Sequence, residues 1–150
     1  MGTIQRLSEI EGITMVKEAT GKLDQCSAIA GTTNLTVLSG DDSLTLPMMS
    51  VGAEGVISVV GNLVPGPMIE LVNAALADDF VTARTLHHRL FGLCSSMLGL
   101  STNPIPIKAA MQMVGRDTGE MRLPMTPLEP PQFDELREAL LQFGLTSAVG

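Results

Sequence analysis

The first two-thirds of the chain alternates short apolar runs of strand type with segments of helical periodicity. The strand-like runs lie at residues 12–16, 35–38 and 56–60, and each is followed by polar or glycine residues and then by a helical pattern. This alternation is typical of βαβ units, in which successive strands lie parallel in one sheet. The sequence therefore predicts an α/β fold whose first part contains three βα units.

From residue 79 onward the strand pattern ends and only helical spacing remains. We therefore expect an α/β region at residues 1–78 and a helical region at residues 79–150. Gly31 is expected to end the helix before it, and Gly144 follows the last helix. The expected helices lie at residues 22–30, at 43–51, from about 65 onward, at 79–100, at 107–114 and after a proline-rich connector at 123–131.

Composition limits the partners that the chain can bind. Among its 150 residues, 9 are Lys or Arg and 16 are Asp or Glu, which gives a formal net charge of −7. The chain contains four Phe and neither Tyr nor Trp. A phosphate backbone requires basic side chains and unpaired bases require aromatic platforms, so we expect no nucleic-acid partner.

The cysteines and histidines do not predict a metal site. Cys26 and Cys94 lie far apart in the sequence, without a His or Cys at metal-ligand spacing, and are expected to be reduced thiols of an intracellular protein. His87 and His88 are adjacent within a helical pattern and therefore point in different directions. No signal segment and no membrane span are apparent, and the expected location is the cytoplasm.

Lys17 is the clearest candidate for a chemically reactive residue, because an uncharged run of residues leads directly to this lysine at the end of a predicted strand. A lysine desolvated at such a place favours its neutral form, which can attack a carbonyl group and form a Schiff base. The pattern alone also allows a lysine that reaches water or pairs with Glu18, because lysines at strand ends are common. The turn after the second predicted strand, Ser-Gly-Asp-Asp at residues 39–42, can be explained by a helix cap as well as by a ligand site.

Five stretches of the chain, in this order and spacing, resemble the dihydrodipicolinate synthase family. The resemblance covers essentially the whole chain but only the C-terminal half of that family's polypeptide. The stretches are Val16-Lys17-Glu18-Ala19-Thr20-Gly21, Leu38-Ser39-Gly40-Asp41-Asp42, Gly55-Val56-Ile57-Ser58-Val59 with Asn62, Asn103-Pro104-Ile105-Pro106-Ile107-Lys108 and Arg122-Leu123-Pro124-Met125-Thr126-Pro127.

The resemblance implies the C-terminal part of a TIM (β/α)8 barrel, of about three βα units, followed by a helical extension. It implies a class I aldolase-type lyase of lysine biosynthesis, in which Lys17 forms the Schiff base with pyruvate before condensation with aspartate 4-semialdehyde. Gly40 and the backbone of Ile57 match positions that line the pyruvate pocket. The resemblance implies no metal or organic cofactor, and either a homo-oligomer or association with an N-terminal half.

Other functions remain open at this level. The family's tyrosine relay and its carboxylate-binding arginine lie N-terminal to the Schiff-base lysine, so this chain alone is expected to be incompetent. A non-catalytic half-barrel remnant is therefore an alternative, as is another pyruvate-dependent aldolase such as N-acetylneuraminate lyase. Periodicity alone would also allow an unrelated small α/β binding module. The unpaired strands at the edges of a partial barrel are expected to invite association.

Overall fold

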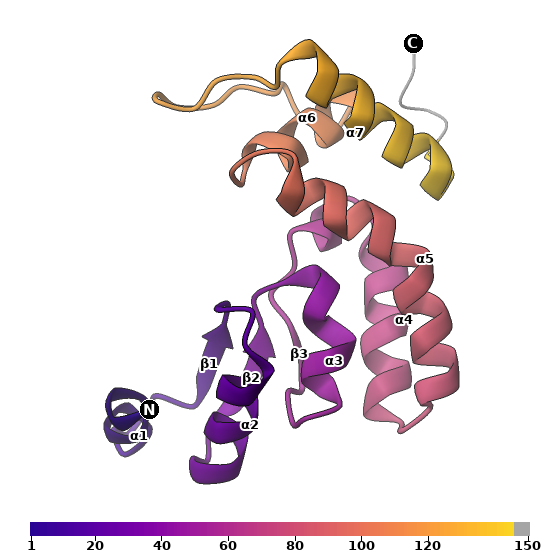
Figure 1. The fold of residues 1–150 in the computed structure, drawn as a ribbon. Coiled ribbons are helices and arrows are strands. Elements are labelled where there is room, and N and C mark those ends of the chain that lie inside the picture. Colours follow the sequence, from indigo (N-terminus) through magenta and orange to yellow (C-terminus); the bar gives the residue numbers. More distant parts are fainter. Residues whose placement is uncertain (146–150) are drawn as a thin grey trace. The chain divides into compact units, whose positions relative to one another are not determined.

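A computed structural model describes residues 1–145 of the chain (Figure 1). The described residues form two compact units, one made of residues 1–58 with 66–87 and the other of residues 59–65 with 88–145. The division at residues 78 and 79 that we expect from the sequence stays a prediction. None of the described helices is both long enough and apolar enough to cross a bilayer.

Three parallel strands form the sheet of the first unit, as the βαβ pattern predicts. They are β1 (Met15–Glu18), β2 (Thr36–Ser39) and β3 (Gly55–Val56), and they lie in the order β1-β2-β3. In the register of the sheet, Lys17 pairs with Leu38, and Leu38 pairs with Gly55. The outer edges of β1 and β3 therefore have no strand neighbour among residues 1–145.

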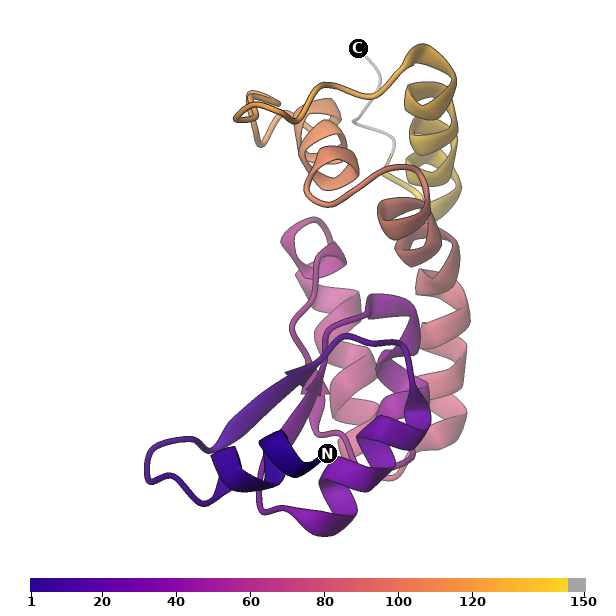
Figure 2. The ribbon, with the colours of Figure 1, turned by 60° about the vertical axis from the view of Figure 1, so that its left-hand side comes forward.

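Two helices cover one face of this sheet, α2 (Leu23–Thr32) and α3 (Thr45–Met49) (Figures 1 and 2). The core between them is fully enclosed; it contains Cys26, Ile29, Val37 and Met48, each no more than 1% exposed. Because side chains alternate along a strand, Met15 and Lys17 point to the opposite face. We call this face, which carries Met15, Lys17 and Leu38, the open face; Met15 is 61% exposed on it.

Further helices in or entering the first unit are α1 (Gly2–Ser8), α4 (Pro65–Leu76) and the beginning of α5 (Phe80–Gly99). The sequence predicts α4 and α5, and Pro65 opens α4 as expected, since proline is tolerated in a first turn. The sequence does not predict α1. This seven-residue helix buries none of its residues, and two apolar residues at helical spacing, Ile4 and Leu7, are too few to predict a helix.

The third predicted strand is wrong in its extent. We expected residues 56–60 to be one strand, but β3 ends at Val56 and Val60 begins a 3₁₀ turn, η2 (Val60–Asn62). Val60 is fully buried there. An apolar run of this length cannot by itself distinguish a buried strand from a buried turn, because both conceal the same side chains.

Two predicted helix boundaries also differ. The helix expected at residues 43–51 is a 3₁₀ turn, η1 (Asp42–Leu44), followed by the short α3. Pro47 has no N–H to donate to the Ser43 carbonyl, so the α-helical ladder cannot extend back to that residue. Gly31 does not end α2, which continues to Thr32; Thr33 ends it, with both its N–H and its hydroxyl donating to the Ile29 carbonyl at 3.0 and 2.9 Å.

The second unit contains the end of α5 together with α6 (Ile105–Met113) and α7 (Pro130–Phe143). The predicted end of α7 is confirmed, because Gly144 caps this helix with a φ of +99°. At the other end, Glu129 and Gln132 form a capping box. The core of this unit includes Leu93, Met97, Ala110, Leu136 and Leu140, all at most 2% exposed.

Candidate active site

The three residues that the resemblance implies for the site come together at one end of the sheet. Lys17 is the third residue of β1, Gly40 directly follows β2, and Ile57 directly follows β3. Because the strands are parallel, their carboxyl ends share one edge, which is where α/β proteins place ligand sites. The site thus belongs entirely to the first unit.

Gly40 and Lys17 lie against each other. A Cβ atom placed on Gly40 would lie 2.8 Å from Cε of Lys17 and 2.5 Å from Cβ of Ala19, both too close for carbon atoms. Glycine is therefore required at position 40 for lack of space and not for its backbone conformation. The aliphatic part of the Lys17 side chain passes over the place where any other residue would have a side chain.

Backbone hydrogen bonds hold the two turns in place beyond the ends of the strands. The N–H of Gly40 donates to the carbonyl oxygen of Glu18 at 2.6 Å, and the N–H of Ile57 donates to that of Ser39 at 2.8 Å. The side chain of Ile57 is 45% exposed. What Ile57 can offer a ligand at this edge is therefore its backbone and an exposed apolar surface.

Lys17 is exposed, which agrees with the alternative of a lysine that reaches water and not with a desolvated amine in this chain. The reason is that the open face, to which Lys17 points, is not covered by α2 or α3. The alternative pairing with Glu18 is not formed in the described residues 1–145. The Glu18 carboxylate lies on the other face of β1, where it accepts hydrogen bonds from Thr20 and Gln25.

The turn after β2 is built by its own polar side chains. The hydroxyl of Ser39 donates to the carbonyl oxygen of Asp41 at 2.8 Å and accepts from the N–H of Asp41 at 3.2 Å. The Asp42 carboxylate, only 3% exposed, accepts a hydrogen bond from the hydroxyl of Ser58, which follows Ile57. Asp42 therefore links the turn that carries Gly40 to the turn that carries Ile57.

Sequence reasoning missed the roles of Glu18 and Asp42. Both carboxylates are buried, at 2% and 3% exposure, although acidic residues are rarely buried without a partner. The available signal was position, because each acidic residue lies at or just after the end of a buried strand. A helix cap explained Asp42 locally, and its partner Ser58 lies 16 residues away.

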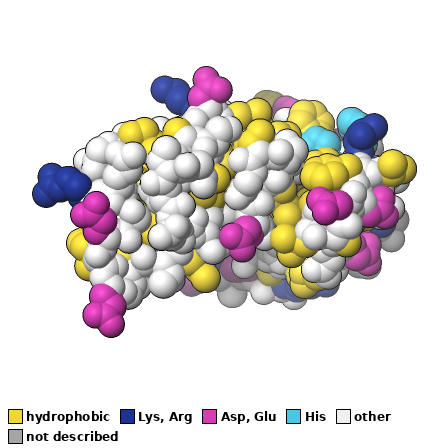
Figure 3. All heavy atoms as spheres, turned by 90° about the horizontal axis from the view of Figure 1, so that it is seen from below, with side chains coloured by type: hydrophobic (Ala, Val, Ile, Leu, Met, Phe, Trp, Pro, Cys, Tyr) yellow, Lys and Arg dark blue, Asp and Glu magenta, His cyan; other side chains and the backbone are white. Residues whose placement is uncertain are grey.

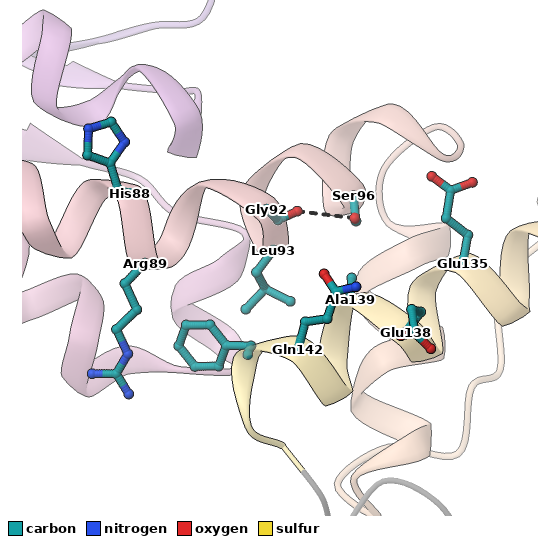
Figure 4. A pocket seen from close by; sticks show the side chains of 10 residues that line it. His88, Arg89, Gly92, Leu93, Ser96, Glu135, Glu138, Ala139 and Gln142 are labelled. Carbon is teal, nitrogen blue, oxygen red and sulfur yellow. Dashed lines mark hydrogen bonds between the residues drawn. The ribbon is translucent and has the colours of Figure 1, made fainter.

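A separate groove of about 500 Å³ lies in the second unit, between α5 and α7 (Figure 4). Charged and polar side chains line much of it, including Arg89, Glu135 and Gln142, and the guanidinium carbon of Arg89 lies 5.3 Å from the ring centre of Phe143. On its floor, the hydroxyl of Ser96 donates to the Gly92 carbonyl at 3.1 Å. The groove contains none of the three expected site residues.

The basic side chains of this acidic chain form no continuous patch on the face that Figure 3 shows. On the face drawn in Figure 3, Lys and Arg side chains are separated from one another by acidic and uncharged groups. Within residues 1–145, no group of three or more His, Cys, Asp and Glu side chains is arranged to hold a metal ion.

Comparison with known proteins gives a consistent result at the level of sequence. The model of the dihydrodipicolinate synthetase family matches residues 1–143. The chain is 47% identical over 140 residues to 4-hydroxy-tetrahydrodipicolinate synthase of Methanothrix thermoacetophila, a match that covers 91% of this chain and 47% of that protein. The enzyme of the same name from Aquifex aeolicus is 46% identical over 140 residues, covering 92% and 47% of the two chains.

Solved structures agree. A crystal structure of dihydrodipicolinate synthase superposes with a TM-score of 0.92 at 44% identity, over 96% of this chain and 50% of the other. The structure of the synthase from Aquifex aeolicus gives a TM-score of 0.91 at 44% identity, over 95% and 49%. The fold is therefore part of a TIM barrel, as expected, and the chain spans about half the length of the curated relatives it matches. With its sequence and its strands both matching the C-terminal half of these proteins, the chain belongs to the dihydrodipicolinate synthetase family.

Proposed function

We propose that this chain is the lysine-bearing half of a cytoplasmic lyase that condenses pyruvate with aspartate 4-semialdehyde in lysine biosynthesis. The observation that carries the proposal is the placement of Lys17 directly over Gly40 at the carboxyl edge of the sheet, in a chain of this family. Membership alone would not be enough, because a family member can lose its site. Here the lysine that we propose as the nucleophile and a glycine that leaves room for it are both present.

The covalent steps use the amine of Lys17 and the carbonyl groups of the two substrates. The neutral Nζ adds to the ketone carbon of pyruvate, and loss of water gives an imine that withdraws electrons from the neighbouring methyl group. Loss of a methyl proton gives an enamine, which attacks the aldehyde carbon of the semialdehyde. The new carbon–carbon bond is followed by cyclisation, which displaces Lys17 and releases the product.

Turnover needs groups that these 150 residues do not contain. The chain has no tyrosine, so no phenol in it can act as the proton relay of the family. Positioned acids and bases typically contribute about 10²–10⁴-fold to such steps. We propose that an N-terminal half supplies them, and that its strands cover the open face and thereby desolvate Lys17.

Reductive trapping tests the proposal. The chain is incubated with pyruvate and sodium borohydride, its intact mass is measured, and any adduct is located by peptide mapping. The expected result is one reduced pyruvyl group on Lys17 that is absent from Lys17→Ala. A folded chain that acquires no adduct, or that acquires it equally at Lys22 and in Lys17→Ala, would contradict the proposal.

A second candidate is a non-catalytic half-barrel, and the exposure of Lys17 favours it for the chain by itself. The two candidates differ when an N-terminal half is added. We expect the separately produced N-terminal half of a relative, such as the Aquifex aeolicus synthase, to increase trapping at Lys17 and to start turnover. A stable complex without either gain would favour the structural role.

A further inference from the structure

Glu18 is a buried acid that the proposed chemistry does not use. It is 2% exposed, and it lies on the face of β1 opposite to Lys17. Its Oε1 accepts hydrogen bonds from the Thr20 N–H at 2.9 Å, the Thr20 hydroxyl at 2.5 Å and the Gln25 side-chain amide at 3.3 Å. Its Oε2 has no hydrogen-bond partner among residues 1–145. Burying a carboxylate with only one of its two oxygens hydrogen-bonded costs free energy, so the presence of Glu18 at this position needs an explanation.

The carboxylate also acts on its surroundings electrostatically. Burial raises the pKa of the Cys26 thiol, and the negative charge of Glu18 raises it further. Cys26 belongs to α2, and Gln25 lies in the first turn of that helix. Glu18 therefore connects the end of β1 to the start of α2 through the short turn between them.

That turn is what places Lys17. Thr20 is fixed by two hydrogen bonds to Glu18, and Ala19 lies between these two residues. The methyl group of Ala19 and the Cε of Lys17 occupy the space above Gly40 side by side, as the contacts of a Cβ at position 40 show. The Gly40 N–H donates to the Glu18 carbonyl oxygen, so the same residue holds the site through its backbone.

We propose that Glu18 is a positioning residue for Lys17: its carboxylate clamps the β1–α2 turn and so holds Ala19 and the Lys17 side chain against Gly40. The need for a clamp follows from the topology, because β1 has only β2 as a strand neighbour in residues 1–145 and its end would otherwise fray. The inference rests on the proposed function for its chemical consequence, but its geometric consequence can be measured independently.

The experiment compares four chains with the wild type. Glu18→Ala removes the clamp, and Glu18→Gln keeps an oxygen that can accept from Thr20. Thr20→Val removes the hydroxyl donor only, and it provides a milder variant should Glu18→Ala fail to fold. Met48→Ala is the control for general destabilisation, because Met48 is a fully buried core residue of α3. Its backbone carbonyl, which accepts a hydrogen bond from the Cys26 thiol at 3.8 Å, is kept in this variant.

Two quantities are measured in each variant, and both are corrected for the folded fraction. The first is the rate of pyruvate trapping at Lys17 with its dependence on pyruvate concentration. We expect Glu18→Ala to lower the rate at saturating pyruvate by on the order of 10–10²-fold, the effect of misplacing a reacting group by about 1 Å. Glu18→Gln should recover most of this loss. Equal losses in Glu18→Ala and Met48→Ala would overturn the proposal.

The second quantity is hydrogen exchange at single amides. We expect exchange at the Gly40 amide to become about tenfold faster or more in Glu18→Ala, the result of local opening. Exchange at the Ser50 amide, which donates to the Leu46 carbonyl in α3, should stay unchanged. If the wild type shows no trapping, the proposed function of this chain is wrong, and exchange alone decides the role of Glu18. Unchanged exchange at Gly40 would then overturn the clamp.

Discussion

Gly40 shows how much of the site depends on residues that take no part in the chemistry. It contributes no side chain, yet the space above it is where Lys17 and Ala19 meet. Glu18 and Asp42 are likewise unreactive, but each connects one strand end to a neighbouring turn. At this scale the position of the Lys17 side chain is decided by steric fit and by buried hydrogen bonds.

Gly40→Ala is expected to damage both stability and reactivity, because its methyl group would overlap Ala19 and Lys17. Overpacking of this kind typically costs about 1–3 kcal/mol of unfolding free energy. Gly31→Ala is the matched control: nothing lies within 4 Å of a Cβ at Gly31, inside α2, and this change should add about 0.5–1 kcal/mol. Chemical denaturation measures the stability of both variants, and pyruvate trapping measures the reactivity of Lys17 in each. A Gly40→Ala variant as stable and as reactive as the wild type would show that the close contact of Gly40 with Lys17 and Ala19 is unimportant.

Asp42→Ala removes the buried carboxylate that accepts the Ser58 hydroxyl. Hydrogen bonds to charged groups contribute about 1.5–3 kcal/mol, and we expect a loss of this size in unfolding free energy. Asp41→Ala should cost less, since Asp41 is only partly buried and its side chain accepts from the hydroxyl of Ser43, two residues further along the chain. Urea titration of the two variants measures the difference, and losses in the opposite order would contradict the proposed link between the turns.

At the scale of elements, the ends of helices and strands decide how far each one extends. Pro47 limits α3, Thr33 ends α2 and Gly144 ends α7. In the second unit, the segment after α6 is held by Asp117, whose carboxylate accepts from Nζ of Lys108 at 3.0 and 2.9 Å and from the Gly119 N–H at 2.7 Å. The hydrogen bond from Lys108, and next that from Gly119, hold the pKa of Asp117 below its usual value.

The lowered pKa of Asp117 predicts a specific pH dependence. A group with a lower pKa in the folded than in the unfolded chain stabilises the fold above its unfolded pKa, about 3.9 for Asp. This stabilisation is lost as the pH falls from there through the folded pKa. Asp117→Asn should therefore be less stable than the wild type at pH 7, and the difference should shrink below about pH 3.9. Thermal unfolding of the wild type and the variant at several pH values tests this prediction. Asp134→Asn, at an exposed position of α7, is the control. A stability difference between Asp117→Asn and the wild type that does not change with pH would show that charge is not the cause.

At the scale of the whole molecule, the chain has the length of about half of its relatives. In the part of the chain that the structure describes, the sheet has two edges without a strand neighbour and one open face. Exposed edges and apolar surface favour association with other strands. The same exposure leaves Lys17 in water, so completing the sheet is expected to increase the reactivity of this lysine.

We therefore expect the purified chain to associate as its concentration increases. Met15→Lys places a charge on the open face and should weaken association about tenfold or more, since burying a Met side chain contributes about 1.5–3 kcal/mol. Val81→Lys is the control, because Val81 is 75% exposed on α5, outside the sheet. Sedimentation velocity over a range of concentrations provides the measurement. A monomer whose unfolding midpoint does not change with concentration would contradict this expectation.

The sequence by itself determined the α/β class, the three βα units, the parallel sheet, most helices and the family, including the placement of Lys17 at a strand end. These are properties of local periodicity, helix caps and short motifs, which are readable along the chain. Only the tertiary structure decided that Val60 lies in a turn, that Glu18 and Asp42 are buried with distant or unexpected partners, and that Lys17 is exposed. Those outcomes depend on which surfaces meet in space. Whether a side chain is buried or exposed is a property of the assembled fold, and no local sequence pattern contains it.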